Sequence, residues 1–492
     1  MRLDEAWGRM RDTVIPAKLA DPQSTGSDPG LKAIAGSMFG DQATAPTADE
    51  ARKALFKAGK WSASGGWAEV SYGHETMIRY AASDVLDTAL IAKAVQWPDE
   101  TVLTRERIAQ EMTARVSYRG LKLDGDRIDR LTAEHQEARS TALTAVKASG
   151  VDNPGSAKQV GDRLTELGAD LPETATGKPS VAADVLEGMR DAGGEVGELV
   201  RAVLDYRHHD KAVSAFLEPY RDLIDNGDGR ARPTVYTLAA DTGRMSCVRP
   251  NFQQVPQAGG FRGCVVADPG YRGISADFSG VEIRTLAALS GCADLARYIV
   301  EEDSAPPGAK VGLHWAIARE VWGADATKAH RYKAKRGVFG KFYGASIRKI
   351  AQTLGIPEAQ AAAIIEMLDA LAPGASLWAE QLKRSVRGGL RQFEAYSGRI
   401  IHLDPALPHK APNYAIQGSA RELLVDALIR WRATKWGTCT LLPIHDELIV
   451  MVPEDEAEEA TKALVECMET TLMGVRIKVE ADDPWTAWPD AV

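Results

Sequence analysis

Apolar side chains recur at every third or fourth position through much of this chain, which is the spacing of a helix that buries one face. The longest such pattern covers 126–150 and uses Ile128, Leu131, His135, Ala138, Ala142 and Val146. Another covers 75–97 and stops before Pro98, which favours a helix end there. Shorter helical patterns, which together make residues 105–225 an α-rich subdomain, lie at 156–168, 180–193 and 196–224.

Strand-like patterns stand outside these helical blocks, at 232–238, 272–278 and 440–452. In the last of them only the short polar stretch 445–447 separates two apolar runs, which predicts a β-hairpin. The region 283–384, between the second and third strand patterns, is mostly helical. Strands and helices thus occupy separate segments, as in an α+β protein.

Composition narrows the choice of protein class. The chain has 492 residues, 45% of them hydrophobic and 26% charged, which suits several well-buried domains of an ordinary globular protein. It has neither an apolar segment of the secretory kind near its start nor an apolar run of membrane-spanning length, so we expect a cytoplasmic protein. Its five cysteines are scattered without CxxC pairs and are expected to be reduced thiols.

Charge is distributed unevenly along the chain. The formal net charge is −9, yet the 22 residues from Lys328 to Lys349 hold eight Lys or Arg and no Asp or Glu. A local positive field on an acidic protein indicates a binding site for a polyanion.

Four residues of this basic segment recur at every fourth position: Arg331, Lys335, Phe339 and Tyr343. On an α-helix they form one stripe about 18 Å long. Two cations followed by two rings have the order needed to hold a triphosphate and then a sugar and base. A solvated basic helix face would explain the charges, but it would not explain two aromatic rings in register with them.

Two acidic residues lie where strand patterns end. Asp277 is near the end of the run 272–278, and Asp446 lies in the polar interruption of the expected hairpin. Two carboxylates brought to one end of a sheet can hold a pair of Mg²⁺ ions about 4 Å apart, the arrangement that drives in-line phosphoryl transfer. An aspartate in a turn is usually a cap or a solvated residue. That interpretation weakens here because both aspartates occur with the basic stripe between them.

These residues together resemble a family, the family A DNA polymerases, over roughly residues 100–492. The motif DFSGVEIR at 277–284 resembles the family's first metal motif, and the stripe matches its RxxxKxxxFxxxYG helix at every fixed position. The tripeptide HDE at 445–447 is similar to the motif of its second carboxylate. The segments TGRMS, 242–246, and PNFQ, 250–253, are similar to signatures that contact the primer-template minor groove.

The resemblance implies roles for the matched residues. Asp277 and Asp446 would ligate two Mg²⁺ ions, while the cations Arg331 and Lys335 would neutralise the phosphates of a dNTP. Residues implied to contact the nucleotide are Ser279, Gly280, Glu282, His314, Phe339 and Tyr343. Glu282 would occupy the space of a ribose 2′-OH. Contacts to DNA are implied for Arg207, Lys211, Arg244, Gln253, Asn413, Gln417 and His445.

Two positions depart from the family pattern. Gly280 stands where many members have Gln, although phage members also carry Gly. Gly312 stands where the family has the Asp of a DxH motif, which leaves His314 without its usual neighbour. A histidine that packs between helices is the alternative interpretation of His314.

The amino-terminal part resembles the end of a 3′-5′ exonuclease domain. The residues from Tyr80 to Asp84, YAASD, are similar to its YxxxD motif, whereas its DxE and central Asp motifs are absent. A lone YxxxD is also a common chance match. Without the other carboxylates two metals cannot be held, so we expect little or no proofreading by this chain. The missing part would come from a separate polypeptide or from an earlier gene start, or the activity is lost.

Two other functions stay open at this point. A single-subunit RNA polymerase shares the two aspartates and a basic helix, but Glu282 argues against it because such an enzyme must admit a 2′-OH. A catalytically silent nucleic-acid-binding protein would have lost a metal carboxylate or a phosphate cation, and all four are present in this chain.

The expected architecture is a right-hand polymerase with an antiparallel palm sheet, helical fingers and a helical thumb, preceded by a partial ribonuclease H-like domain. The expected bounds are 1–97 for the exonuclease-like domain, 98–231 for the thumb and palm-entry helices, 232–300 and 400–492 for the palm, and 301–399 for the fingers. The expected partners of this monomer are primer-template DNA, dNTPs and a separate polypeptide that completes the exonuclease. The setting implied by the resemblance is phage or bacterial DNA replication or repair.

Overall fold

The computed structural model describes residues 12–20, 30–63, 65–174, 176–306 and 308–490. The chain divides into two compact units, each assembled from separate stretches of sequence. The first unit contains Met1–Thr113, Val235–Ser246 and Lys383–Thr434, and the second contains Ala114–Thr234, Cys247–Leu382 and Lys435–Val492. The five parts expected from the sequence are finer than these units and stay a prediction.

The first unit is mainly helical. Its helices are α2 (Val14–Ala20), α3 (Leu31–Phe39), α4 (Ala45–Ala58), α5 (Gly66–Glu69), α6 (Glu75–Ala94) and α20 (Ala411–Arg432). It also contains most of α7 (Glu100–Arg119) and the end of α19 (Pro373–Arg387). The strands β7 (Gln392–Glu394) and β8 (Ile400–His402) form an antiparallel pair.

Buried ion pairs connect the distant segments of the first unit. Arg421 of α20 pairs with Glu106 of α7 at 2.5 Å and with the neighbouring Glu422 at 3.0 Å. Arg399, which precedes β8, also donates to Glu422 at 2.7 Å. All four side chains are at most 3% exposed, so removing one partner would leave an uncompensated charge in the interior. The network therefore fixes α20 against α7 and the β7–β8 hairpin.

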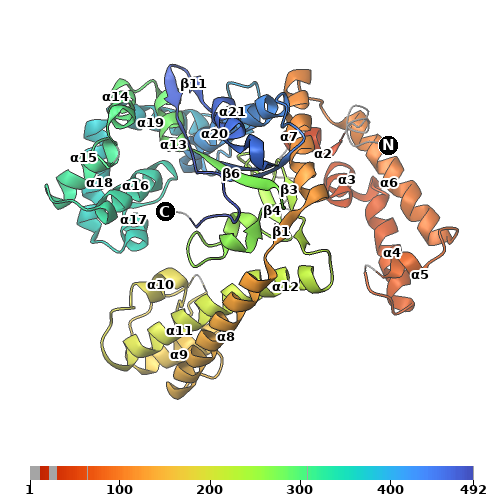
Figure 1. The fold of residues 1–492 in the computed structure, drawn as a ribbon, viewed down its shortest axis with the longest axis horizontal. Coiled ribbons are helices and arrows are strands. Elements are labelled where there is room, and N and C mark those ends of the chain that lie inside the picture. Colours follow the sequence, from red (N-terminus) through yellow and green to blue (C-terminus); the bar gives the residue numbers. More distant parts are fainter. Residues whose placement is uncertain (1–11, 21–29, 64, 175, 307, 491–492) are drawn as a thin grey trace. The chain divides into compact units, whose positions relative to one another are not determined.

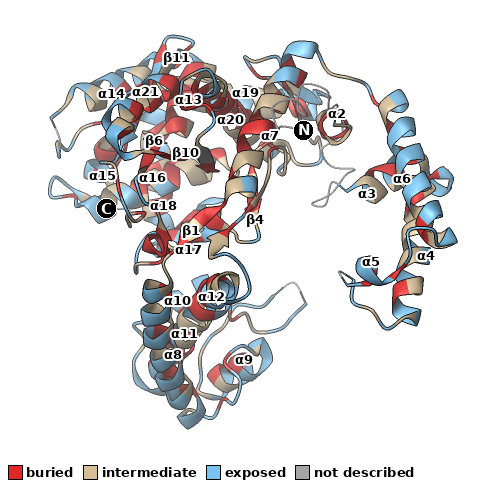
Figure 2. Ribbon diagram, turned by 45° about the vertical axis from the view of Figure 1, so that its right-hand side comes forward, coloured by how far each residue is buried: buried red, intermediate tan, exposed pale blue. Residues whose placement is uncertain are grey.

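The second unit is built around an antiparallel sheet with strand order β13–β6–β10–β9. These strands are β6 (Tyr271–Phe278), β9 (Thr440–Ile444), β10 (Glu447–Pro453) and β13 (Val479–Ala481). β6 and β10 pair from Asp277–Glu447 at one end to Tyr271–Pro453 at the other. The apolar run LIVMV of β10 is buried throughout, and Figure 2 shows buried residues concentrated in these two strands. The sheet predicted from distant strand patterns is confirmed.

Helices of the second unit fall into two sequence blocks, which Figure 1 shows in different colours. The first block has α8 (Gly125–Ala148), α9 (Ala157–Glu166), α10 (Ala183–Glu187), α11 (Gly194–Ala212), a π-helical turn (Val213–Leu217) and α12 (Glu218–Asp225). The second has α13 (Val281–Ser290), α14 (Ala293–Ser304), α15 (Leu313–Trp322), α16 (Lys328–Phe342), α17 (Ile347–Leu354), α18 (Glu358–Leu371) and the first part of α19.

Short strands and one further helix complete the fold. β1 (Leu121–Leu123) lies between β2 (Arg230–Ala231) and β5 (Val265–Val266), and β11 (Thr470–Leu472) pairs with β12 (Val475–Ile477). β3 (Thr234–Tyr236) pairs with β4 (Ser246–Val248), and α21 (Ala457–Met468) follows β10.

Most predicted elements are confirmed, with two differences in length. The helix predicted at 126–150 is α8, and the hairpin predicted at 440–452 is formed by β9 and β10. The helix predicted at 180–193 is only five residues long, because Gly188 follows α10 and Gly193 precedes α11, which itself begins at Gly194. The strand predicted at 232–238 is reduced to β3, residues 234–236.

The described residues of 12–97 form α-helices and a 3₁₀ turn, without a β-strand. A ribonuclease H-like domain is built around a sheet, so the exonuclease assignment of 1–97 stays a prediction, and its stretches 1–11 and 21–29 lie outside the described residues. In the described part of the chain no single helix passes a length and hydropathy test for crossing a membrane, and only the pair α18–α19, bent by 102°, does so jointly.

Gly273 of β6 provides a test of the sheet. Its backbone exchanges two 2.8 Å hydrogen bonds with Trp485, and a Cβ added to Gly273 would lie 2.4 Å from the Trp485 ring. Gly273→Ala should therefore lower the free energy of unfolding by about 1–3 kcal/mol, although alanine suits a strand better than glycine. Chemical denaturation followed by circular dichroism measures this change.

The matched control is Gly36→Ala in α3, where an added Cβ meets nothing within 4 Å. This variant should keep or raise the stability, since alanine is the better helix former. A Gly273→Ala variant as stable as the native chain would show that Trp485 does not constrain the strand.

Candidate active site

Two carboxylates meet at one end of the palm sheet. Asp277 is the next-to-last residue of β6, and Asp446 lies in the tight turn between β9 and β10. The turn is made possible by His445, whose φ of 58° lies in the left-handed region. The N–H of Phe278 donates to the carbonyl oxygen of Asp446 at 3.3 Å, which holds the turn against the end of β6. The structure thus brings together two residues that lie far apart in the sequence.

The sheet register surrounds Asp277 with further acids. Its direct partners are Glu447 on β10 and Glu480 on β13. Asp277 is exposed to solvent. Desolvation by the surrounding protein, followed by the charges of Asp446 and Glu447, nevertheless raises the pKa of Asp277 to about 8, while Lys335 opposes the shift. Hard oxygen donors with uncompensated negative charge are the ligands that Mg²⁺ prefers, so the residues present fit a divalent cation.

The basic stripe is carried by α16. Thr327 caps its first turn by accepting a 3.3 Å hydrogen bond from the N–H of His330. The rings of Phe339 and Tyr343 stack with centroids 6.0 Å apart, and Lys335 Nζ lies 6.0 Å from the centre of the Phe339 ring. The predicted helix is confirmed, with Tyr343 at its C-cap.

A cavity of about 100 Å³ lies beside this stripe. Among its lining residues are Ser279, Gly280, His314, Arg331, Lys335 and Phe339. All six were predicted from the sequence to bind a nucleotide or its phosphates, and the structure brings them together. Lys335 is close enough to both Asp277 and His314 to affect their pKa values, so the cavity and the carboxylates form one site.

Glu282 and Tyr343 are connected directly. The Tyr343 hydroxyl donates a hydrogen bond to Glu282 Oε2, which links the first turn of α13 to the end of α16. The residue predicted to exclude a 2′-OH is thereby held by a residue predicted to lie next to the base.

His314 is buried and uncharged. Burial, followed by the charges of Arg331 and Lys335, lowers the pKa of His314 to about 3. Its Nε2 has no hydrogen-bond partner among the described residues. The imidazole therefore lines the cavity as a neutral group and not as a phosphate-binding cation.

Glu302 is a residue of this site that the sequence did not reveal. Its Oε1 accepts a 2.8 Å hydrogen bond from Arg331, and a Cβ added to Gly312 would lie 2.9 Å from its Oε2. The carboxylate of Glu302 thus lies where Gly312 replaces the Asp of the DxH motif. The lost Asp was visible in the sequence, but no signal there identified Glu302 as its replacement.

Arg284 was also missed as a support of the site. Its side chain is 4% exposed and donates to Asp303 at 2.6 and 2.8 Å and to the carbonyl oxygen of Ser279 at 2.6 Å. Burial alone would raise the pKa of Asp303, but the hydrogen bonds from Arg284 outweigh it and lower that pKa. This pair fixes the turn between β6 and α13, which carries Ser279 and Gly280.

The residues predicted to contact DNA are divided between the two units. In the second unit the exposed His445 ring shares a 3.2 Å hydrogen bond with the carbonyl oxygen of Gln253. Lys211 on α11 is exposed, whereas Arg207 donates to the carbonyl oxygens of Pro154 and Val181 at 3.1 and 2.8 Å. Arg207 thus ties down neighbouring loops in this structure.

The other predicted DNA contacts lie in the first unit. Asn413 and Gln417 are one helical turn apart on α20, and Asn413 Oδ1 is buried without a partner among the described residues. Arg244 follows Gly243, which has a φ of 82°. A Cβ added to Gly243 would lie 2.8 Å from the guanidinium of Arg399, so the two residues are in close contact. The turn that presents Arg244 is thus supported by the buried ion network.

Tyr80 and Asp84, the predicted exonuclease remnant, both contact Lys32. The ammonium group donates to the Tyr80 hydroxyl at 3.0 Å and to Asp84 Oδ1 at 2.6 Å. Among the described residues no cluster of potential metal ligands includes Asp84. In this structure Asp84 forms an ion pair, and its descent from an exonuclease stays a prediction.

Comparison with known proteins identifies the family of the chain. The family model described as DNA polymerase family A matches residues 126–486. The DNA polymerase of Mycobacterium phage D29 is 26% identical over 99% of this chain and 81% of its own length. The thermostable DNA polymerase I of Thermus filiformis is 32% identical over 62% of this chain and 38% of its own length.

A solved structure has the same fold. The POL domain of Pol1 from M. smegmatis, in complex with DNA primer-template and dNTP, matches with a TM-score of 0.76 and 22% identity over 97% of this chain and 81% of that one.

Fold and sequence together define the class of the protein as a nucleic-acid polymerase, an enzyme that transfers nucleotides under the direction of a template. The chain belongs to DNA polymerase family A. The function predicted from the sequence, template-directed DNA synthesis, is confirmed. Neither an RNA polymerase nor a silent binding protein is supported.

Proposed function

We propose that this polymerase adds dNMPs to a primer 3′-OH at the site formed by Asp277, Asp446 and Lys335. The observation that carries this assignment is that two acids from distant strands meet beside the helix stripe of cations and rings predicted for a triphosphate. The solved structure with a similar fold was bound to primer-template DNA and dNTP, which supports the same partners here. The phage relatives support action in the cytoplasm of an infected bacterium.

Asp277 and Asp446 would hold two Mg²⁺ ions. When bound, these ions lower the pKa of the attacking 3′-OH and stabilise the leaving pyrophosphate. Lys335 and Arg331 would bind the nucleotide phosphates and neutralise the charge that develops on them. Since Arg331 is paired with Glu302 in this structure, the triphosphate must replace that carboxylate.

The remaining cavity residues would select the nucleotide. Phe339 would pack against sugar and base, and Tyr343 would lie at the template side of the new pair. Glu282 would block a ribose 2′-OH, and its bond to Tyr343 keeps it in place. Ser279 and Gly280 would offer backbone contacts in the turn held by Arg284, and His314 would fill the cavity wall.

DNA contacts would be made by both units. Arg244, Gln253 and His445 would contact the minor groove near the primer end, where acceptors are shared by all correct base pairs. Asn413 and Gln417 would lie near template and primer. Lys211 and Arg207 would contact the DNA backbone, although Arg207 must first leave its two carbonyl partners.

A separate polypeptide remains our proposal for the incomplete exonuclease. The large apolar side chains Ile78, Val85, Leu86 and Leu90 of α6 are 37–71% exposed, which is typical of a surface that another polypeptide covers. By itself the chain should leave single-stranded DNA intact, and a primer-extension gel would reveal any shortened strands.

Asp446→Asn tests the metal assignment. It keeps the size of the side chain but removes a charged ligand, so kcat for primer extension should fall by at least about 10³-fold. Chelation with EDTA should abolish wild-type activity, and added Mg²⁺ should restore it. The measurement is primer extension on a gel with dNTPs and, separately, rNTPs.

The matched control is Asp455→Asn, which alters an exposed acid after the opposite end of β10 and should extend primers normally. An active Asp446→Asn enzyme with an unchanged Mg²⁺ requirement would refute the assignment.

Glu302→Gln tests the competition for Arg331. The amide keeps the shape of the side chain but cannot form the ion pair, so the KM for dNTP should fall by about 2–10-fold with little change in kcat. Steady-state single-nucleotide incorporation measures both constants. Glu301→Gln, which removes an exposed partner of Arg297 from the same helix, should leave both unchanged. A KM that is unchanged or raised in Glu302→Gln would contradict the competition.

Phe339→Tyr tests the position of the sugar. The added hydroxyl can replace the hydrogen bond that a dideoxynucleotide cannot make, so the preference for dNTP over ddNTP should fall by up to about tenfold. Competitive incorporation on a primer gives this ratio. Tyr332→Phe, on the exposed face of α16, is the control for altered ring chemistry on the helix. If Phe339→Tyr leaves the preference for dNTP over ddNTP unchanged, Phe339 does not lie next to the sugar.

A further inference from the structure

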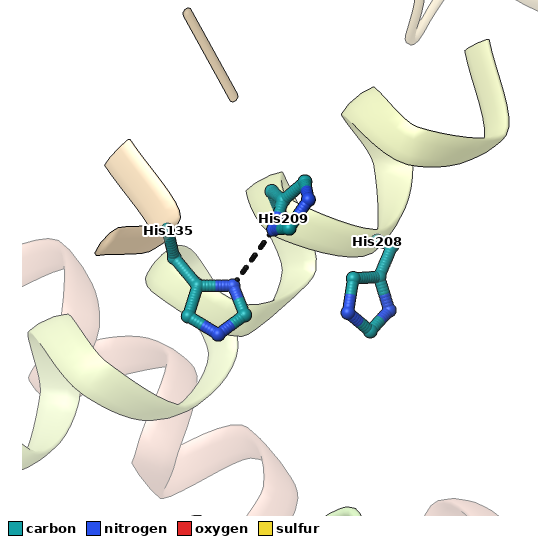
Figure 3. A group of neighbouring side chains, drawn as sticks. All are labelled: His135, His208 and His209. Carbon is teal, nitrogen blue, oxygen red and sulfur yellow. Dashed lines mark hydrogen bonds between the residues drawn. The ribbon is translucent and has the colours of Figure 1, made fainter. Parts of the chain in front are cut away.

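Three histidines without an assigned role in DNA synthesis gather on two neighbouring helices of the second unit, one of which also carries Arg207 and Lys211, the proposed DNA-backbone contacts. His135 belongs to α8, while His208 and His209 belong to α11, and the two helices pack along each other (Figure 3). One ring nitrogen of each histidine lies within 4.8 Å of those of the other two. The sequence pattern had placed His135 on the apolar face of its helix, and the structure gives it two imidazole neighbours there.

The contact between His135 and His209 is close. Their Nδ1 atoms are 2.9 Å apart, and His135 is only 9% exposed. Two neutral imidazoles can share one proton across such a contact. When each ring carries its proton on Nε2, the lone pairs of the two Nδ1 atoms face each other. A cation between the rings would accept both lone pairs, and neither imidazole would have to lose its proton. His208 lies beside this pair, with its ring centroid 5.0 Å from that of His209.

The surroundings favour neutral rings. Burial, followed by the charges of the neighbouring histidines, lowers the pKa of His135 and of His209, while Glu134 and Asp205 oppose these shifts weakly. Metal ligation needs the neutral form of imidazole. Phe261, with its ring centroid 5.1 Å from that of His135, closes the cluster on one side, and the exposed His208 leaves a path for an ion.

Other charged groups nearby are already engaged. Asp210 accepts hydrogen bonds from Arg139 at 3.1 Å and from the Tyr206 hydroxyl at 3.4 Å. Asp205 pairs with Arg190 at 3.4 Å. With these two acids paired, the three imidazoles are the donor set that the structure brings together for a ligand.

We propose that His135, His208 and His209 bind one transition-metal ion, with Zn²⁺ as the best fit. Imidazole nitrogen suits Zn²⁺, Ni²⁺ and Cu²⁺, whereas Mg²⁺ prefers oxygen, so this site differs in chemistry from the carboxylates Asp277 and Asp446. Tetrahedral Zn²⁺ with bonds of about 2.0–2.1 Å holds nitrogens about 3.3–3.4 Å apart. The His135–His209 pair needs to open by only a few tenths of an ångström, and His208 needs to turn toward it. Water would take the fourth position.

Such an ion would connect α8 to α11 by coordination bonds in addition to their apolar packing. Because the ion binds only when both helices are folded together, it would stabilise the second unit, and this stabilisation would increase with the concentration of free metal ion. The inference does not depend on the proposed catalytic roles, since none of the three histidines has one.

The test is titration of the full chain with Zn²⁺ against a chromogenic chelator, in excess Mg²⁺ to occupy the carboxylates. The wild type should bind one Zn²⁺ per chain. His208→Ala alters an exposed side chain and should fold normally, yet it should weaken binding by at least about tenfold, as should His135→Gln. Asp446→Asn and His409→Ala, an exposed histidine on a 3₁₀ turn of the first unit, should bind as the wild type does.

A spectroscopic measurement identifies the ligands. With Cu²⁺ in place of Zn²⁺, electron paramagnetic resonance should show coupling to several imidazole nitrogens, and His208→Ala should reduce their number. The proposal is overturned if wild type and His208→Ala bind Zn²⁺ equally, or if Asp446→Asn abolishes the binding while both histidine variants retain it. The second result would place the zinc at the carboxylates.

Discussion

The register between β6 and β10 is the constraint on which the candidate active site depends. Side chains alternate between the two faces of a sheet, so a slip of one residue would turn Asp277 to the opposite face and away from the β9–β10 turn. Several features oppose such a slip. β10 is buried along its whole apolar run, and Gly273 leaves room for the Trp485 ring at one point of β6 only. The packing of the far end of the strand thus determines the position of the acid at its functional end.

The same register concentrates negative charge at a cost in stability. Asp277 faces Glu447 and Glu480 across the sheet, with Asp446 in the adjoining turn. Desolvation, followed by the charges of Asp446 and Glu447, raises the pKa of Asp277 to about 8. Lys335 offsets part of this charge from α16, and Arg262 approaches Glu447 to 3.6 Å. A bound cation would relieve the repulsion that remains among these acids, so their clustering favours cation binding. The same arrangement of acids therefore accounts for the raised pKa of Asp277 and for the expected need for Mg²⁺.

Sequence periodicity predicted the structural features that are determined by residues close together in the sequence. The helix α8, the β9–β10 hairpin and the stripe on α16 all follow from spacing within one segment, and their motifs indicated the family. Contacts between segments could not be predicted in this way. Glu302 reaches Arg331 from another helix, Arg284 binds Asp303 on α14, and His135 meets two histidines of α11. Nothing in the spacing of one helix specifies which residues of another will face it. The shortening of α10 had a local cause, since the glycines near 188–194 were visible but were outweighed by the apolar pattern.

Glu302 also shows why a motif can lose a residue and keep its site. The carboxylate expected at position 312 is absent, but the Glu302 carboxylate lies beside Gly312 and accepts a hydrogen bond from Arg331. Because Gly312 has a φ of 91°, the start of α15 can approach α14 closely enough for this contact. In the function we propose, Arg331 would meet an incoming triphosphate with one carboxylate already bound. Nucleotide binding at this position is then an exchange of one anion for another, and its free energy is the difference between two charge-assisted hydrogen bonds rather than the whole of either. Under this proposal, Glu302 would set the affinity for nucleotides independently of the carboxylates Asp277 and Asp446.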